Sequence, residues 1–212
     1  MTERYFLYVA DPMCSWCYAF APVVTALEQH FRGRLGMRLV MGGLRAGNTQ
    51  AMRPQDKDYI RNAWTRVNAA SGQPFDSSFF DRDGFVYDTE PACRAVVTIR
   101  GRDPSRALAL MSRIQTAFYA ENRDVTSADV LADLAADEGQ DRAAFLEALM
   151  SPDLRNETFR DFLRAKEMGI EGYPALLVGG VAGGFALVTH GYRPLDGMPE
   201  AIEDWLAKQP AA

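Results

Sequence analysis

Two cysteines stand one helical turn apart near the start of the chain, in the stretch DPMCSWCYAFAP at residues 11–22. On a helix, Cys14 and Cys17 would share one face, because residues i and i+3 are neighbours there, and they could close a disulfide with little backbone movement. The same spacing provides half of a tetrahedral zinc site. The pair therefore indicates dithiol redox chemistry, metal binding or a structural contact.

The residues around the pair predict a strand, a turn and a helix. Residues 4–10 form an apolar and aromatic run typical of a buried strand, which Asp11-Pro12 ends. Gly33 stops the predicted helix at about residue 32, and residues 35–42 alternate like a second strand. The apolar residues that give the helix one buried face are Phe20, Val24, Leu27 and Phe31. The cysteines thus fall at the strand-to-helix turn of a β-α-β unit.

A helix start favours a thiolate, since unpaired N–H groups and the positive end of the helix dipole stabilise an anion there. We therefore expect Cys14, the outer cysteine, to attack disulfides. Cys17, one turn further in, is the expected resolving thiol, which releases a mixed disulfide.

The metal alternative needs two more ligands. The chain offers Cys93, His30 and His190, and none of them forms a second ligand pair. Cys93 follows Thr89, a predicted helix cap, on an apolar helical stripe, so we expect it to pack in the core, with a second redox role such as glutathionylation as the alternative. We expect His30 to end a helix and His190 to end a strand at the surface. Redox chemistry is the favoured interpretation.

The middle of the chain has a different pattern. Residues 43–54 are predicted to form a loop, and only helices are predicted between about 56 and 168, with Ser127, Asp141 and Ser151 as caps. Strands follow at 174–180 and 185–191, and a last helix is expected over 195–207. The order is β-α-β, helices, β-β-α.

The strand, the C-x-x-C pair at a helix start, the proline five residues beyond Cys17 and the late GYPALLV together resemble the thioredoxin fold. With the helical insertion, almost the whole chain is similar to DsbA-type thiol oxidoreductases, nearest their cytoplasmic FrnE-like branch. The resemblance implies an α/β thioredoxin fold with a large all-helical insertion, divided as 1–45, 46–168 and 169–212. It also implies a kink at Pro22 and a cis bond at Tyr173-Pro174, in a loop that faces the sulfurs and binds an extended substrate through backbone groups.

Some positions leave alternatives open. Ser15 and Trp16 between the cysteines bring no cation to the thiolate, so the redox poise stays undetermined. Asp11 could accept a proton from Cys17 or form the turn of an Asp-Pro pair, and the turn is favoured. We expect Trp16 to be exposed as an apolar contact for peptide substrates, and Tyr18 to pack in the core. Related folds that isomerise hydroxychromene carboxylates or conjugate glutathione keep a serine where Cys14 stands, which favours dithiol chemistry here.

Composition excludes several classes. The chain has 212 residues, 48% of them hydrophobic, and a formal net charge of −5, which argues against a nucleic-acid partner. No stretch approaches the roughly 20 apolar residues that a membrane span needs. The start MTERYFLYVADP lacks the pattern of a secretory leader, and three cysteines are too few for a disulfide scaffold, so we expect a cytoplasmic protein.

The sequence therefore predicts a thiol–disulfide oxidoreductase with catalytic Cys14 and Cys17, and with Trp16, Tyr173 and Pro174 in substrate binding. Its expected partners are protein or small-molecule disulfides and thiols, with glutathione as a candidate co-substrate and no metal or bound organic cofactor. Two alternatives remain: a chaperone-like binding module with vestigial cysteines, and a glutathione-dependent isomerase or transferase.

Overall fold

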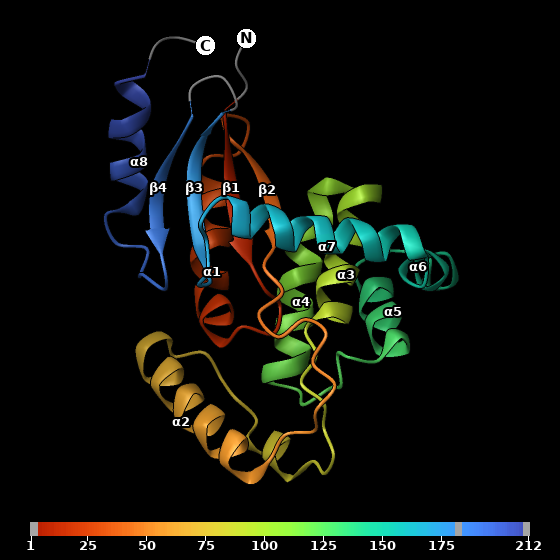
Figure 1. Ribbon diagram of the computed structural model, residues 1–212. Coiled ribbons are helices and arrows are strands. Elements are labelled where there is room, and N and C mark those ends of the chain that lie inside the picture. Colours follow the sequence, from red (N-terminus) through yellow and green to blue (C-terminus); the bar gives the residue numbers. More distant parts are fainter. Residues whose placement is uncertain (1–3, 181–183, 210–212) are drawn as a thin grey trace.

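A computed structural model describes residues 4–180 and 184–209. Four strands form one sheet, in the order β2-β1-β3-β4 (Figure 1). They are β1 (Tyr5–Ala10), β2 (Gly36–Met41), β3 (Ala175–Gly180) and β4 (Gly184–His190). β1 runs parallel to β2 and antiparallel to β3, and β4 is antiparallel to β3. The predicted strands and their order along the chain are confirmed.

The sheet is covered on both faces, because side chains along β1 alternate between two apolar clusters. Phe6, Tyr8 and Ala10 pack in the cluster that also contains the apolar faces of α1 (Ser15–His30) and α8 (Met198–Ala207). Tyr5, Leu7 and Val9 pack on the other side with Ala165 of α7 (Pro152–Glu167). In Figure 1, α7 accordingly crosses in front of the sheet and α1 lies behind it.

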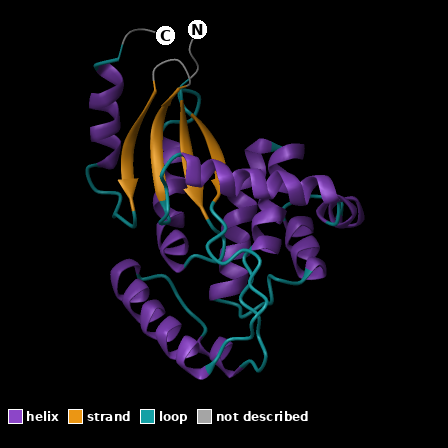
Figure 2. Ribbon diagram, in the orientation of Figure 1, coloured by secondary structure: helices purple, strands orange, loops and turns teal. Residues whose placement is uncertain are grey.

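Most helices between β2 and β3 lie at the β2 side of the sheet, and the first of them lies beyond its lower end (Figure 1 and Figure 2). Besides α7, they are α2 (Pro54–Ser71), α3 (Glu90–Arg102), α4 (Ala107–Tyr119), α5 (Ala128–Asp137) and α6 (Arg142–Leu149). None of the helices in the described ranges is long and apolar enough to cross a bilayer. The helical block is confirmed, while its division from the rest at residues 46 and 168 stays a prediction.

The expectation of helices alone is wrong for residues 72–89. Gly72 ends α2 in the left-handed conformation, with φ of 72°. The chain then forms a short 3₁₀ helix at Ser77–Asp81, and an isolated bridge joins Val86 to Ala51 in the predicted loop. Aromatic packing explains this path, because Phe79 and Phe80 both contact the ring of Trp64 on α2. Burial of these rings holds residues 72–89 in place although most of the segment is not helical.

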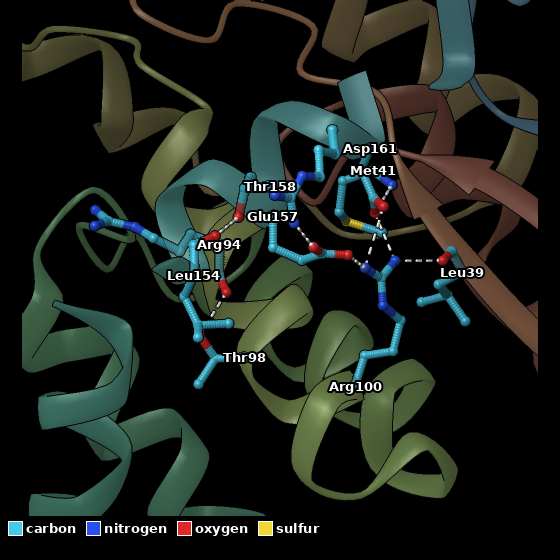
Figure 3. Close-up of polar contacts among 10 residues, drawn as sticks. Leu39, Met41, Arg94, Thr98, Arg100, Leu154, Glu157, Thr158 and Asp161 are labelled. Carbon is cyan, nitrogen blue, oxygen red and sulfur yellow. Dashed lines mark hydrogen bonds and ion pairs between the residues drawn. The ribbon is translucent and has the colours of Figure 1, made fainter. Parts of the chain in front are cut away.

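An ion pair between a buried carboxylate and a partly exposed guanidinium joins the helical block to the sheet edge (Figure 3). Asp161 of α7 accepts a hydrogen bond from the Met41 backbone N–H at 2.9 Å and pairs with Arg100 of α3 at 2.5 Å. Arg100 also donates to the Leu39 carbonyl of β2 at 2.7 Å. One carboxylate and one guanidinium therefore connect α3 and α7 with the end of β2.

Helix ends follow the predicted caps in part. Asp141 and Ser151 accept backbone hydrogen bonds at the starts of α6 and α7. Ser127 and Thr89 occupy N-cap positions without a side-chain capping bond. The last helix starts at Met198 rather than at 195, because Gly197 precedes it in the left-handed conformation, with φ of 72°. Pro22 lies inside α1, which continues to His30, and its kink stays a prediction.

Candidate redox site

The strand directions bring distant segments to one end of the sheet. β1, β2 and β4 end there, β3 begins there and α1 starts there, at the lower end of the sheet in Figure 1. Cys14 follows β1, Gly42 follows β2, and Tyr173-Pro174 immediately precedes β3. α2 lies beyond this end in the same view. The topology thus collects the residues that the sequence singled out.

Cys14 occupies the N-cap position of α1, with Cys17 one turn into the helix. The backbone N–H of Cys14 donates to the Asp11 carbonyl at 3.1 Å, and the Cys14 carbonyl accepts from the Tyr18 N–H at 3.0 Å. All three cysteines of the chain are free thiols. Cys14 is 5% exposed, and Cys17 and Cys93 are fully buried, so Cys14 is the cysteine nearest to solvent.

The loop before β3 touches the outer sulfur. The Tyr173-Pro174 bond is cis, and the Cys14 thiol donates a long hydrogen bond to the Tyr173 carbonyl, with 3.6 Å between Sγ and O. The Tyr173 hydroxyl donates to the Gly42 carbonyl at 2.7 Å, which holds the loop against the end of β2. Gly42 is required there, since a Cβ at this position would collide with the Tyr173 ring.

Asp11 organises the turn between β1 and α1. Its side chain, fully buried, accepts from the Met13 N–H at 2.8 Å and from the Leu44 N–H at 2.7 Å. The Cys93 thiol donates to the same carboxylate, with 3.5 Å between Sγ and Oδ2. Burial raises the pKa of Asp11, and the hydrogen bonds from Leu44, Met13 and Cys93 oppose that shift. The turn-forming role of Asp11 is confirmed, and it extends to the loop after β2.

Cys17 lies in an apolar interior where its thiolate is hard to form. Burial raises the pKa of Cys17 well above its usual value, and the neighbouring Cys14 thiol raises it further. A backbone hydrogen bond from Asp11 works in the opposite direction. The two thiols therefore influence each other directly, and the inner one is protonated in the resting dithiol.

Aromatic rings flank the pair on two sides. Trp16 is partly exposed and stacks on Tyr192, with ring centroids 5.8 Å apart. Tyr18 is buried and stacks on Tyr119 at 4.9 Å, as expected for a core residue. The Tyr192 hydroxyl donates to the Ala70 carbonyl of α2 at 3.3 Å, so the end of α2 contacts the same rim.

The two histidines end a helix and a strand, as expected. His30 is exposed at the end of α1 and lies 3.3 Å from Glu203, as a helix-end residue should. His190 is exposed at the end of β4. Its ring lies beside Gly172, next to Tyr173, because a Cβ added to that glycine would be 3.3 Å from the His190 Nε2. No cluster of three or more histidine, cysteine or acidic side chains suited to a metal ion occurs among the described residues.

Sequence reasoning missed two residues of this region. Tyr192 follows β4 and meets Trp16 only through the fold, so no local pattern identifies it. Tyr8 is fully buried on the face of β1 that carries Ala10 toward α1, and strand alternation from Ala10 could have placed it under the helix. The contact of Cys93 with Asp11 was equally invisible, because 82 residues separate them.

Comparison with solved structures gives full-length matches. The chain is 34% identical to a candidate protein disulfide isomerase from Nitrosomonas europaea, with 98% of this chain and 100% of that chain covered and a TM-score of 0.91. It is 26% identical to the cytosolic disulfide reductase DsbM from Pseudomonas aeruginosa, with 96% and 98% covered and a TM-score of 0.79. A structure of that reductase with GSH matches with a TM-score of 0.77, at 26% identity over 96% of this chain and 99% of that chain.

Among curated proteins, the ClpXP adapter protein SpxH of Halalkalibacterium halodurans is 24% identical over 174 residues, which are 79% of this chain and 56% of that protein. The chain thus spans about half the length of the curated relatives it matches. The profile of the DSBA-like thioredoxin domain matches residues 7–203, from within β1 into α8. The chain therefore belongs to the family of DSBA-like thioredoxin domains.

Proposed function

We propose that this protein is a cytoplasmic thiol–disulfide oxidoreductase that uses Cys14 and Cys17 as a dithiol and disulfide pair. One observation carries the proposal: Cys14 stands at the start of α1 with its Sγ 3.6 Å from the Tyr173 carbonyl, next to Pro174. A sulfur at this position lies next to the unpaired backbone N–H groups of the first helical turn. Beside it lies a stretch of backbone that can align an extended disulfide.

In the reducing direction, the Cys14 thiolate attacks one sulfur of a substrate disulfide. The substrate S–S bond breaks, a mixed disulfide with Cys14 forms, and the departing substrate thiolate takes a proton. Cys17 then loses its proton and attacks the Cys14 sulfur. The mixed disulfide breaks, the Cys14–Cys17 disulfide forms, and the second substrate thiol leaves with the proton. Two electrons pass from the dithiol to the substrate, and the reverse sequence oxidises a substrate dithiol.

Substrate contacts would come from the surroundings of Cys14. Tyr173 and Pro174 offer backbone beside the sulfur, and the partly exposed ring of Trp16, held by Tyr192, offers an apolar surface. The small exposure of Cys14 favours an extended peptide or a small thiol over a bulky partner. Glutathione is a suitable co-substrate to regenerate the dithiol, and the similarity to a reductase with a GSH-bound structure supports it.

The test is disulfide reduction measured by insulin turbidity with glutathione as the electron source. The unchanged chain should be active, and Cys14→Ser should reduce the rate to the background of the assay. Cys17→Ser should accumulate a mixed disulfide with glutathione, visible as added mass. Cys93→Ser is the matched control, since Cys93 is equally buried but is not assigned to the exchange.

Activity that survives Cys14→Ser would overturn the assigned nucleophile. Absence of activity in every form would favour the second candidate, a binding module without redox chemistry, which the similarity to two proteins named ClpXP adapters supports. Glutathione-dependent isomerisation or transfer would instead appear as turnover that persists in Cys17→Ser.

A further inference from the structure

The Tyr8 hydroxyl is a buried polar group that the folded chain leaves unpaired. Tyr8 lies on β1, between β2 and β3, and is fully buried. Among the described residues, no group meets the distance and angle of a formed hydrogen bond to its hydroxyl oxygen. Phenylalanine would fill the same site without this penalty, since a buried hydroxyl without a partner is unfavourable. The hydroxyl is therefore unexplained by packing.

The ring of Tyr8 points toward the first turns of α1. Its ring centroid is 6.0 Å from that of Phe20, which follows Cys17 by one helical turn. The Tyr8 pKa is raised well above its usual value, first by burial and then by the thiols of Cys17 and Cys14, and Cys17 acts as its hydrogen-bonding neighbour. Tyr8 and Cys17 lie in the same apolar cluster, and the Tyr8 hydroxyl forms no hydrogen bond with the described residues in the dithiol state.

Cys17 needs a donor when it reacts. Its sulfur is fully buried, and it must become a thiolate before it can attack the mixed disulfide at Cys14. The titratable groups around it are Tyr8 from β1, Asp11 from the turn, Cys14 from α1 and Tyr173 from the loop before β3. The Asp11 carboxylate disfavours a second negative charge, and Cys14 is uncharged once it is part of the mixed disulfide. The Tyr173 hydroxyl already donates to the Gly42 carbonyl. The Tyr8 hydroxyl has no partner in the described part of the chain and is the neutral donor that can favour the charge.

We propose that Tyr8 is a positioning residue for the resolving step, donating a hydrogen bond from its hydroxyl to the Cys17 sulfur as that sulfur becomes a thiolate. This inference rests on the proposed function. Cys17 gives its proton to the leaving substrate sulfur through solvent, attacks Cys14 and forms the intramolecular disulfide. Tyr8 keeps its own proton throughout, because its hydroxyl is too weak an acid to release it. The Asp11 N–H provides the second donor to the same sulfur.

The experiment follows the two sulfurs separately. Reduced chain carrying Cys93→Ser is mixed with an aromatic disulfide whose released thiolate is coloured. Attack by Cys14 releases the first thiolate at a rate proportional to reagent concentration. Attack by Cys17 on the resulting mixed disulfide releases the second at a rate independent of it. The second phase therefore reports the resolving step alone.

Tyr8→Phe should slow the second phase and leave the first unchanged. Loss of a hydrogen bond to a charged group raises a thiol pKa by about one to two units, and the greater nucleophilicity of a more basic thiolate returns about half of that in logarithmic terms, so we expect a decrease of about three- to tenfold. At higher pH the second-phase rates of the chains with Tyr8 and with Phe at position 8 should become more similar, because Cys17 ionises in both. Tyr5→Phe is the matched control, since Tyr5 is also buried on β1 but packs on the opposite face of the sheet.

A second variant covers the case in which Tyr8→Phe does not fold. A fluorinated tyrosine at position 8 keeps the ring and makes the hydroxyl a stronger donor, so the second phase should become faster. Unchanged second phases in both variants, or equal slowing of both phases, would overturn the inference. Absence of the first phase in the Cys93→Ser chain would instead refute the proposed function itself, because Cys14 would then not attack disulfides.

Discussion

Two buried polar regions of this protein are built in opposite ways. Between α3, α7 and β2, the Asp161 carboxylate pairs with Arg100 and also accepts the Met41 N–H, so its charge is compensated. Near the start of α1, the Tyr8 hydroxyl is buried without a formed hydrogen bond to any described residue, in the same apolar cluster as Cys17. The first arrangement stabilises the folded chain, because every charge has its partner. In the second, a free hydroxyl donor can stabilise the Cys17 thiolate, which exists only during the reaction. This difference separates a structural cluster from a reactive one.

The largest effect is expected at the compensated cluster. Asp161→Ala leaves the Met41 N–H without its acceptor and the Arg100 guanidinium with only the Leu39 carbonyl and the more distant Glu157. It should lower the free energy of unfolding by about 3 kcal/mol in a denaturant titration. Disulfide reduction per folded molecule should be unchanged. The double variant Arg100→Met with Asp161→Leu should recover part of the loss, because it removes both charges but leaves the Met41 N–H unpaired. A loss for Asp161→Ala below about 1 kcal/mol would contradict the comparison.

The next effect concerns the carboxyl group under the cysteine turn. Because burial raises the pKa of Asp11 above its ordinary value of 3.8, the folded chain binds this proton more tightly than the unfolded chain. The free energy of unfolding of the unchanged chain should therefore increase, relative to Asp11→Asn, as the pH falls through the raised pKa toward 3.8.

Urea titrations of both chains across that window measure the Asp11 contribution directly. The exposed carboxyl groups with lowered pKa values, such as Asp76 and Asp103, cancel because both chains contain them. A difference between the two chains that does not change with pH would show that Asp11 binds its proton equally in both states.

A smaller effect is expected at the aromatic rim. Tyr192→Ala removes the ring that orients Trp16, and because such a stack contributes about 0.5–1.5 kcal/mol, the KM for a peptide disulfide should rise about two- to tenfold. The kcat should change little. Tyr192→Phe is the control, since it keeps the stack and loses only the hydrogen bond to the Ala70 carbonyl. Equal KM values for the two variants would contradict a role of the Trp16 ring in substrate binding.

The smallest effect sharpens the contrast between buried and exposed ion pairs. Arg142 contacts Asp129 at 2.9 Å and Asp133 at 2.6 Å on the surface of the helical block. Water screens these exposed charges, so Arg142→Ala should leave the midpoint of urea unfolding within experimental error. A loss comparable to that of Asp161→Ala would mean that burial does not distinguish the two clusters.

Local sequence patterns predicted most of the fold. The run over residues 4–10, the apolar spacing of α1 and the two late strands were recovered within a few residues, because each depends on the periodicity of a single element. The segment around Phe79 was not, since its path depends on packing against Trp64, and rings that pack with distant partners carry no local period. The predicted start of α8 was wrong by three residues, because the sequence does not show that Gly197 adopts the left-handed conformation.

For the site, the sequence by itself determined that two thiols stand one turn apart at the start of a helix, since spacing and capping are properties of neighbouring residues. The family resemblance placed the Tyr173-Pro174 loop beside the sulfurs. Only the tertiary structure decided that the Tyr173 carbonyl, 159 residues away, is the group that Cys14 contacts, and that the buried Tyr8 hydroxyl has no partner among the residues described. Periodicity fixes which face of an element is buried, but the pairing of strands and the docking of helices choose what that face meets.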